Sequence, residues 1–338
     1  MEGRGSEAVR LSAIGSAGAV AASLLIAVPL GFFFMNIYGT IDAYIGWILV
    51  LIVVLMIATE NGEVVEGQGS LVHLKYKGFA IVLFLLSGVL GLFAFDNTDK
   101  MTPLVTIGEP SILLPLLSGL FGASMLVLAM MTHSEVPPQQ KNCRFTLPGK
   151  KIIRGIISGS AAGSFVAWLP GVSSAVGTII ARLLVREDKG EEASKEFIIS
   201  LSGANTANAI FSLIALYTIQ RTRSGAMVAI NGLVNIEEWD ISFMIMLLAI
   251  IVFVSILSYY ATIYLGDRIS GLLSKIDYSK LSCAVLIFLT LMVVMFTGWF
   301  GLVIFLISTP VGMVASFAKI RKTHAMGVIL LPVILYFF

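Results

Sequence analysis

A break inside a hydrophobic run constrains the fold of this chain more than any other feature. The run extends from Ile152 to Leu184, and the segment Trp168-Leu169-Pro170-Gly171-Val172-Ser173-Ser174-Ala175 lies at its centre. A proline, a glycine and two hydroxyls at this depth leave backbone groups unpaired, which a membrane tolerates only where the backbone lines a protein-buried or water-filled cavity. The break therefore predicts a binding site, and the rest of the chain is the scaffold that buries it.

The composition identifies the solvent in which this scaffold folds. The 338 residues are 57% apolar and only 12% charged, whereas an average soluble domain is about 25% charged. We therefore expect an all-α polytopic membrane protein. The net charge of +2 gives no reason to expect nucleic-acid binding, because the basic residues lie almost entirely in loops. The three histidines, His73, His133 and His324, flank apolar segments and are interpreted as interface residues; no metal site or cofactor is expected.

Hydrophobic runs near the ~20 residues needed to span a bilayer occur on both sides of the broken run. They cover about 11–35, 42–59, 77–95, 111–131, 241–265, 281–297, 302–318 and 324–338. With the N-terminus on the inner side, nearly all of the basic loops also lie inside, as the positive-inside rule requires. We expect a multi-pass protein of a prokaryotic plasma membrane, with its N-terminus in the cytoplasm. The first run is too long for a secretory signal peptide.

The loops that flank 152–184 decide how this run crosses the membrane. The preceding loop, 132–151, and the following segment, 182–195, each carry four basic residues, so both belong on the cytoplasmic side. The run is too short for two crossings of ~20 residues each. A re-entrant helical hairpin that turns at Pro170-Gly171 fits both facts. A kinked single helix is the alternative, and it would leave four basic residues outside. The acidic residues of the same region are interpreted as a solvated connector: Glu187, Asp188, Glu191, Glu192 and Glu196.

A second irregular stretch, 198–235, is too long for one plain crossing. It contains Ser202 to Asn208, an apolar run, and then Gln220-Arg221-Thr222-Arg223-Ser224-Gly225. We expect a discontinuous helix, broken near 218–225. The chain then divides into an incomplete first repeat at 1–131, a cytoplasmic loop at 132–151 and a second repeat at 152–338. With about nine crossings, the two halves point in opposite directions, as in inverted-repeat secondary transporters.

The two breaks offer groups that suit an anion. Helix N-termini provide unpaired N–H groups and positive potential, and Gly171 lets a ligand approach the backbone closely. Arg223 could bind a carboxylate with two parallel hydrogen bonds. The predicted substrate-binding residues are Pro170, Gly171, Ser173, Ser174, Arg223, Ser224 and Gly225. A turn with ordinary capping serines and a snorkelling arginine is the structural alternative.

Hydroxyl and amide oxygens on the same two elements suit a hard cation such as Na⁺. The predicted ion-binding residues are Ser173, Ser174, Asn205, Thr206 and Asn208. Hydrogen bonding between helices is the alternative use of such residues. Coupling to H⁺ stays open, although no acidic residue lies mid-span within 152–235. Small residues at Gly155 to Gly163 and at Ala13 to Ala22 predict close helix packing.

The order and spacing of these segments resemble the large permease subunit of the tripartite tricarboxylate transporter family along essentially the whole chain. The resemblance rests on Gly3-Arg4-Gly5-Ser6-Glu7-Ala8 before the first span, on Leu169-Pro170-Gly171, and on Asn205 to Asn208 leading to Arg223-Ser224-Gly225. The segment from Arg321 to Tyr336 looks like that of the archaeal-type branch. The resemblance implies an ion-driven secondary transporter of citrate-like carboxylates, accompanied by a small membrane subunit and an extracytoplasmic solute-binding protein.

This chain departs from the family pattern at its start. Family members carry a first hairpin with its own Pro-Gly tip, and a first broken helix, before the Gly-Arg-x-x-Glu-Ala segment. Here that segment opens the sequence. The sequence leaves three explanations: a start placed too late, a truncated gene, or a second chain that completes the site.

Other functions fit parts of the sequence. A transporter of polyprenyl-phosphate or another lipid head group would use a similar Pro-Gly-Val-Ser hairpin, and a non-transporting partner or remnant subunit would explain the missing first unit. An intramembrane serine hydrolase would need a base within hydrogen-bond reach of Ser173, and His133 is the nearest histidine in sequence. An enzyme is therefore not expected. The chain could also form a homo-oligomer.

Overall fold

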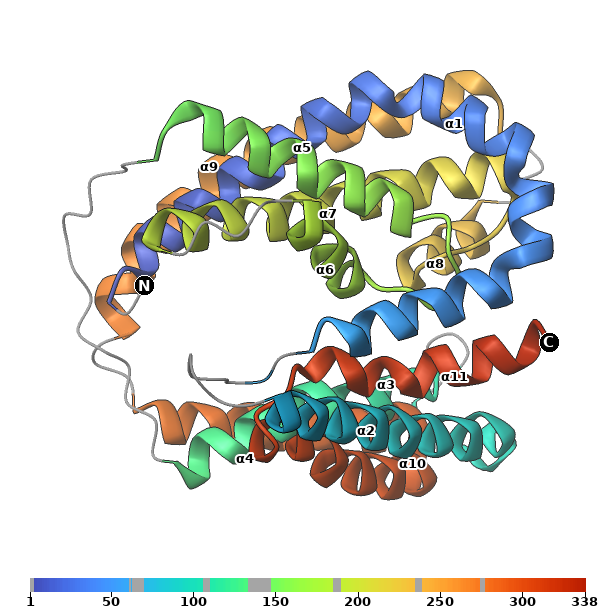
Figure 1. Ribbon diagram of the computed structural model, residues 1–338, viewed down its shortest axis with the longest axis vertical. Helices are drawn as coiled ribbons and strands as arrows, with labels where there is room; N and C mark the ends of the chain where they lie inside the picture. The colour runs from blue at the N-terminus through green and yellow to red at the C-terminus, as the bar shows by residue number, and fades with distance from the viewer. Residues whose placement is uncertain are drawn as a thin grey trace. The chain divides into compact units, whose positions relative to one another are not determined.

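The computed structural model of the chain describes residues 3–60, 62, 70–105, 110–132, 147–184, 190–234, 239–273 and 277–338. Every regular element in these ranges is helical (Figure 1). The chain forms two compact units: unit 1 comprises Met1–Tyr44 and Val136–Lys275, and unit 2 comprises Ile45–Glu135 and Ile276–Phe338. Most of the predicted loop 132–151, together with His133, Glu187 and Asp188, lies outside the described residues.

Six helices of the described chain are long and apolar enough to cross a membrane. The longest, α1 (Gly5–Ala58), has 54 residues, about 80 Å of helix at 1.5 Å per residue against a hydrocarbon core of ~30 Å. The predicted span 11–35 and all but the last residue of the predicted span 42–59 fall within it. The separation expected between these two spans is wrong because residues 36–41 are also helical. The prediction of an all-α polytopic membrane protein is confirmed.

Unit 1 contains the first part of α1 and five further helices. These are α5 (Gly149–Val166), α6 (Ser174–Leu184), α7 (Glu191–Ile219), α8 (Gly225–Leu233) and α9 (Ile241–Leu273). Both predicted chain breaks occur at the expected places: helix is interrupted between α5 and α6 around Pro170-Gly171, and again between α7 and α8 at residues 220–224. Each unit draws on both predicted halves of the chain, and the inverted-repeat relation stays a prediction.

Three glycines on one face of α5 set its distance from α7. A Cβ atom at Gly159 would lie 2.3 Å from the carbonyl oxygen of Ser200, and one at Gly163 would lie 2.2 Å from that of Ala204. At Gly155 the distance to the carbonyl oxygen of Glu196 would be 3.1 Å. Residues spaced by four lie on one face of a helix, so the two backbones touch along three turns. The close packing predicted for Gly155 to Gly163 is confirmed.

A buried ion pair joins the start of α7 to the start of α1. The Lys195 ammonium lies 2.6 Å from the Glu7 carboxylate, and the two side chains are only 3% and 1% exposed. On the next residue, Glu196 is also buried and receives two hydrogen bonds from Arg154 of α5. The interpretation of this region as a solvated connector is therefore wrong for Glu196, because ion pairs with neighbouring helices compensate for its burial.

Unit 2 contains the remainder of α1 and a set of shorter or interrupted helices. These are α2 (Ser70–Asp96), η1 (Thr98–Lys100), α3 (Leu113–Leu117), the π-helical turn η2 (Ser118–Ala123), α4 (Ser124–Met131), α10 (Tyr278–Phe317), η4 (Lys322–Met326) and α11 (Gly327–Tyr336). Its core gathers buried apolar side chains of α2, α3, η2, α10 and α11. The predicted spans 281–297 and 302–318 meet within α10 at Gly298, whose φ of +69° interrupts the helix.

A buried carboxylate ties the end of α1 to the start of η4. Glu60 is 2% exposed and accepts hydrogen bonds from the backbone N–H groups of Gly62 and Arg321. Its Oε2 also lies 2.7 Å from Nε2 of the fully buried His324. Burial alone would raise the pKa of Glu60, but the hydrogen bonds from His324, Gly62 and Arg321 outweigh it and lower this pKa to about 2. The interpretation of His324 as an interface residue is wrong.

We expect Gly159→Ala to destabilise the protein and Gly149→Ala to leave it unchanged or slightly more stable. The first methyl would collide with backbone of α7, and overpacking of this kind costs about 1–3 kcal/mol. The second methyl, on the same helix, would meet no atom within 4 Å. Alanine is also a better helix former than glycine. Thermal unfolding of both variants in detergent micelles measures the difference. Equal melting temperatures would show that the α5–α7 contact is not tight.

We expect Glu60→Gln to destabilise the protein at neutral pH and to lose that effect in acid. The pKa of Glu60 is below its ordinary value of 4.5, so its ionised form contributes stability that is present above pH 4.5 and is lost as the pH falls toward 2. Breaking such a buried pair costs about 3–5 kcal/mol. Unfolding curves at several pH values test this, with the exposed Asp99→Asn as the control. A difference that persists unchanged at low pH would contradict the expectation.

Candidate functional site

The turn between α5 and α6 is built on Gly171. Its φ of +72° lies in the left-handed region, which glycine enters without the steric cost that other residues meet. Helix α6 then folds back on α5. The contact is close, since a Cβ at Gly177 would lie 3.3 Å from Val166 and 3.5 Å from the carbonyl oxygen of Ala162. The chain therefore forms the predicted helical hairpin. That it enters and leaves the membrane on one side stays a prediction.

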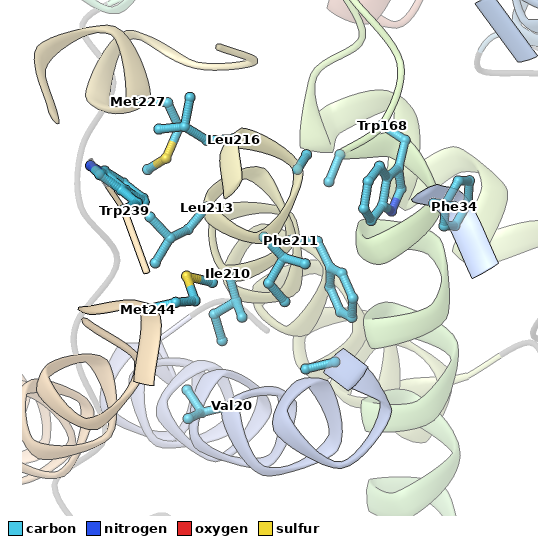
Figure 2. Close-up of a cluster of buried hydrophobic side chains, with 14 residues drawn as sticks. Val20, Phe34, Trp168, Ile210, Phe211, Leu213, Leu216, Met227, Trp239 and Met244 are labelled. Carbon is cyan, nitrogen blue, oxygen red and sulfur yellow. The ribbon is translucent and has the colours of Figure 1, made fainter. Parts of the chain in front are cut away.

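Trp168 anchors the tip of this hairpin. Its side chain is fully buried, and its ring stacks on Phe34 of α1 with a centroid distance of 4.3 Å and an interplanar angle of 8°. Figure 2 shows this pair at the edge of a cluster that includes Phe211 and Leu216 of α7. Stacked aromatic pairs stabilise a fold by more than the area they bury would give. The hairpin tip is therefore held against α1 and α7.

Ser173 and Ser174 lie where α6 begins, as predicted. The Ser174 hydroxyl donates a hydrogen bond to the side-chain oxygen of Asn205 on α7, so the hairpin and the predicted amide ligand are in contact. The Ser173 hydroxyl oxygen is buried and has no hydrogen-bond partner among the described residues. The first N–H groups of a helix also lack partners within it. The Ser173 hydroxyl at this end of α6 is thus a donor for which the described chain supplies no acceptor.

The second chain break follows Ile219. Gln220 ends α7 in the left-handed conformation, and Ser224 begins α8 by accepting a hydrogen bond from the Met227 N–H. Between them, Arg223 donates a hydrogen bond from Nη2 to the hydroxyl of Tyr38 on α1. Tyr38 was not predicted. The sequence feature that could have pointed to Tyr38 is its position four residues after Phe34, which places both aromatic residues on one face of α1.

One face of α1 therefore contacts the residues at both chain breaks. Phe34 holds the hairpin tip, and Tyr38 holds Arg223 one helical turn further along. Side chains with this spacing are neighbours, with Cβ atoms roughly 5–6 Å apart. The structure thus brings the predicted anion-binding residues Ser173, Ser174 and Arg223 onto elements that share one support. Donors gathered in this way, with buried N–H and O–H groups unpaired, suit a ligand rich in acceptor oxygens.

Two predicted ion ligands have less support. Thr206 and Asn208 lie within the regular middle of α7, and the Asn208 carbonyl already accepts a hydrogen bond from the Ser212 hydroxyl at 2.7 Å. Unwound carbonyls are therefore not available there, and any cation contact falls to side-chain oxygens. No group of three or more His, Cys, Asp or Glu residues that could hold a metal ion occurs in the described part of the chain.

Comparison with known proteins identifies the family. The sequence matches the tripartite tricarboxylate transporter TctA family over residues 1–327. The chain belongs to this family. It is also 25% identical to an uncharacterized protein of Methanocaldococcus jannaschii over 353 aligned positions, which cover 100% of this chain and 78% of the relative. This archaeal relative agrees with the predicted archaeal-type branch. No solved structure gives a significant match.

Membership of the TctA family fixes the general function. The chain is a permease-type component of a tripartite transporter family, and its apolar helices make it a multi-pass membrane protein. Such systems combine the permease with a binding protein and a small subunit. The family is one of transporters, in agreement with the expectation that the chain is not an enzyme.

We expect Trp168→Ala to destabilise the protein by about 3–5 kcal/mol, the usual cost of truncating a buried aromatic residue. The variant loses both the Phe34 stack and the filling of the cluster around Phe211. Unfolding in detergent micelles measures this loss against Trp299→Ala, whose indole is 72% exposed. A loss no larger than that of the control would mean that the tip is not seated on α1.

Proposed function

We propose that this chain is the membrane permease component for ion-coupled uptake of small organic anions, of the tricarboxylate or dicarboxylate type, by alternating access. The observation that carries the proposal is the buried Ser173 hydroxyl without an acceptor among the described residues, at the start of α6. A carboxylate there would accept from Ser173 and from the first N–H groups of the helix, whose dipole favours negative charge. Gly171, which has no side chain, leaves room for the ligand beside Pro170.

The coupling ion would bind beside the carboxylate. The Ser174 hydroxyl and the Asn205 side-chain oxygen already meet, and oxygen donors of this kind suit Na⁺. A cation at this contact would stabilise the anion electrostatically, and the anion would stabilise the cation by the same free energy. Na⁺ is favoured over H⁺ because the contact contains no titratable group. Thr206 and Asn208, one and three residues further along α7, would contribute side chains only.

The transporter would work in the plasma membrane of a prokaryote, with the N-terminus in the cytoplasm. The family supports a solute-binding protein that delivers the anion and a small membrane subunit as partners. Substrate selection would then be shared: the binding protein captures the anion outside, and the site at α6 accepts it by its carboxylate.

The decisive experiment is equilibrium binding of radiolabelled citrate and succinate to the purified chain in lipid nanodiscs, with Na⁺ or with choline as the only cation. We expect binding that requires Na⁺. Ser173→Ala should weaken it about 10- to 100-fold, since a hydrogen bond to a charged group contributes about 1.5–3 kcal/mol. Asn205→Ala should weaken the response to Na⁺.

Ser194→Ala provides the matched control, because Ser194 is an exposed serine near the start of α7. It should bind like the wild type. Absence of binding for both acids would refute the proposed substrate class. Equal binding with Na⁺ and with choline would refute coupling to Na⁺ while leaving the anion site in place.

A further inference from the structure

Two arginines of unit 1 present the same edge of the guanidinium group to an acceptor. Arg154 uses Nε and Nη2 together: Nε donates to one oxygen of Glu196 at 2.5 Å, and Nη2 donates to the other at 2.6 Å. This is the two-bond geometry in which arginine recognises a carboxylate. Arg154 therefore shows, within the same chain, an arginine whose Nε and Nη2 both donate to one carboxylate.

The same edge of Arg223 is only half filled. Its Nη2 donates to the Tyr38 hydroxyl, and the guanidinium lies 5.6 Å from the centre of the Tyr38 ring. Its Nε is buried and has no hydrogen-bond partner in the described part of the chain. A phenol presents one oxygen, whereas this edge is shaped for two. Leaving a buried donor unpaired is unfavourable, and more so when the group is charged.

The Tyr38 hydroxyl meets Arg223 as an acceptor, because a guanidinium group can only donate hydrogen bonds. Asp42 lies one turn further along α1 from Tyr38. Tyr38 supplies a single neutral acceptor where Glu196 supplies a carboxylate to Arg154.

We propose that Tyr38 is a displaceable substitute for the substrate: its hydroxyl occupies half of the Arg223 edge until a substrate carboxylate replaces it and fills both positions. This inference rests on the proposed function, and it adds a specificity-determining residue and a second anchoring point for the anion. With one carboxylate at α6 and another at Arg223, the site would favour acids that carry at least two carboxylates. A monocarboxylate or a chloride ion could not satisfy both places.

The consequence is a substitution that improves binding. Tyr38→Phe removes the competing hydroxyl but keeps the ring against the guanidinium, so we expect citrate and succinate to bind about 3- to 10-fold more tightly. Arg223→Lys keeps the charge but cannot form two parallel bonds. It should weaken binding of both acids and should cancel the gain when combined with Tyr38→Phe.

The test measures binding of citrate, succinate and acetate to the wild type, to these variants and to Tyr44→Phe. Tyr44 lies on the same helix with a side chain that is 59% exposed, so its substitution is a matched control and should change nothing. Unchanged or weaker binding by Tyr38→Phe, with Ser173→Ala still impaired, would overturn the role of Tyr38 and leave the proposed function intact. Failure of every variant and of the wild type to bind either acid would overturn both.

Discussion

The contact on which unit 1 depends is the close approach of α5 to α7. Along Gly155, Gly159 and Gly163 no side chain separates the two backbones, and Ser158 and Ser200 meet beside this seam at 3.3 Å. In lipid, where the hydrophobic effect does not drive helices together, such close van der Waals contact provides much of the association energy. The first arm of the hairpin is α5 itself. The glycines that pack α5 on α7 therefore determine where Ser173 and Ser174 lie relative to Asn205, although they are several helical turns away.

The candidate site combines rigid supports with chain breaks. Regular helix satisfies its own backbone groups, and it has none to offer a ligand. The breaks at Gly171 and at Gln220 free such groups, while the Trp168–Phe34 stack and the Arg223–Tyr38 bond fix them on α1. Family membership identifies the chain as a component of a transporter. The local chemistry identifies the donors that have no acceptor among the described residues.

The sequence predicts the interruptions of helix well, because each has a local cause. Proline and glycine at 170–171 and a cluster of polar residues at 220–224 lie where the helix is interrupted. Contacts between distant segments have no such signal. The pairing of Glu60 with His324, and of Lys195 with Glu7, depends on tertiary packing, so these residues read as ordinary interface or loop residues. The helical segment 36–41 was missed because its polar residues also fit a loop.

The Lys195–Glu7 pair has a consequence for how the protein is made. Glu7 precedes Lys195 in the chain, and Lys195 leaves the ribosome only after the intervening residues are synthesised, on the order of 10–40 s at ~5–20 residues per second. A carboxylate is costly inside the bilayer without a partner. Glu7 therefore lacks its ammonium partner until α7 is made, and we expect the start of α1 to reach its buried position only then. The packing of α1 is thus completed by a helix that is synthesised much later.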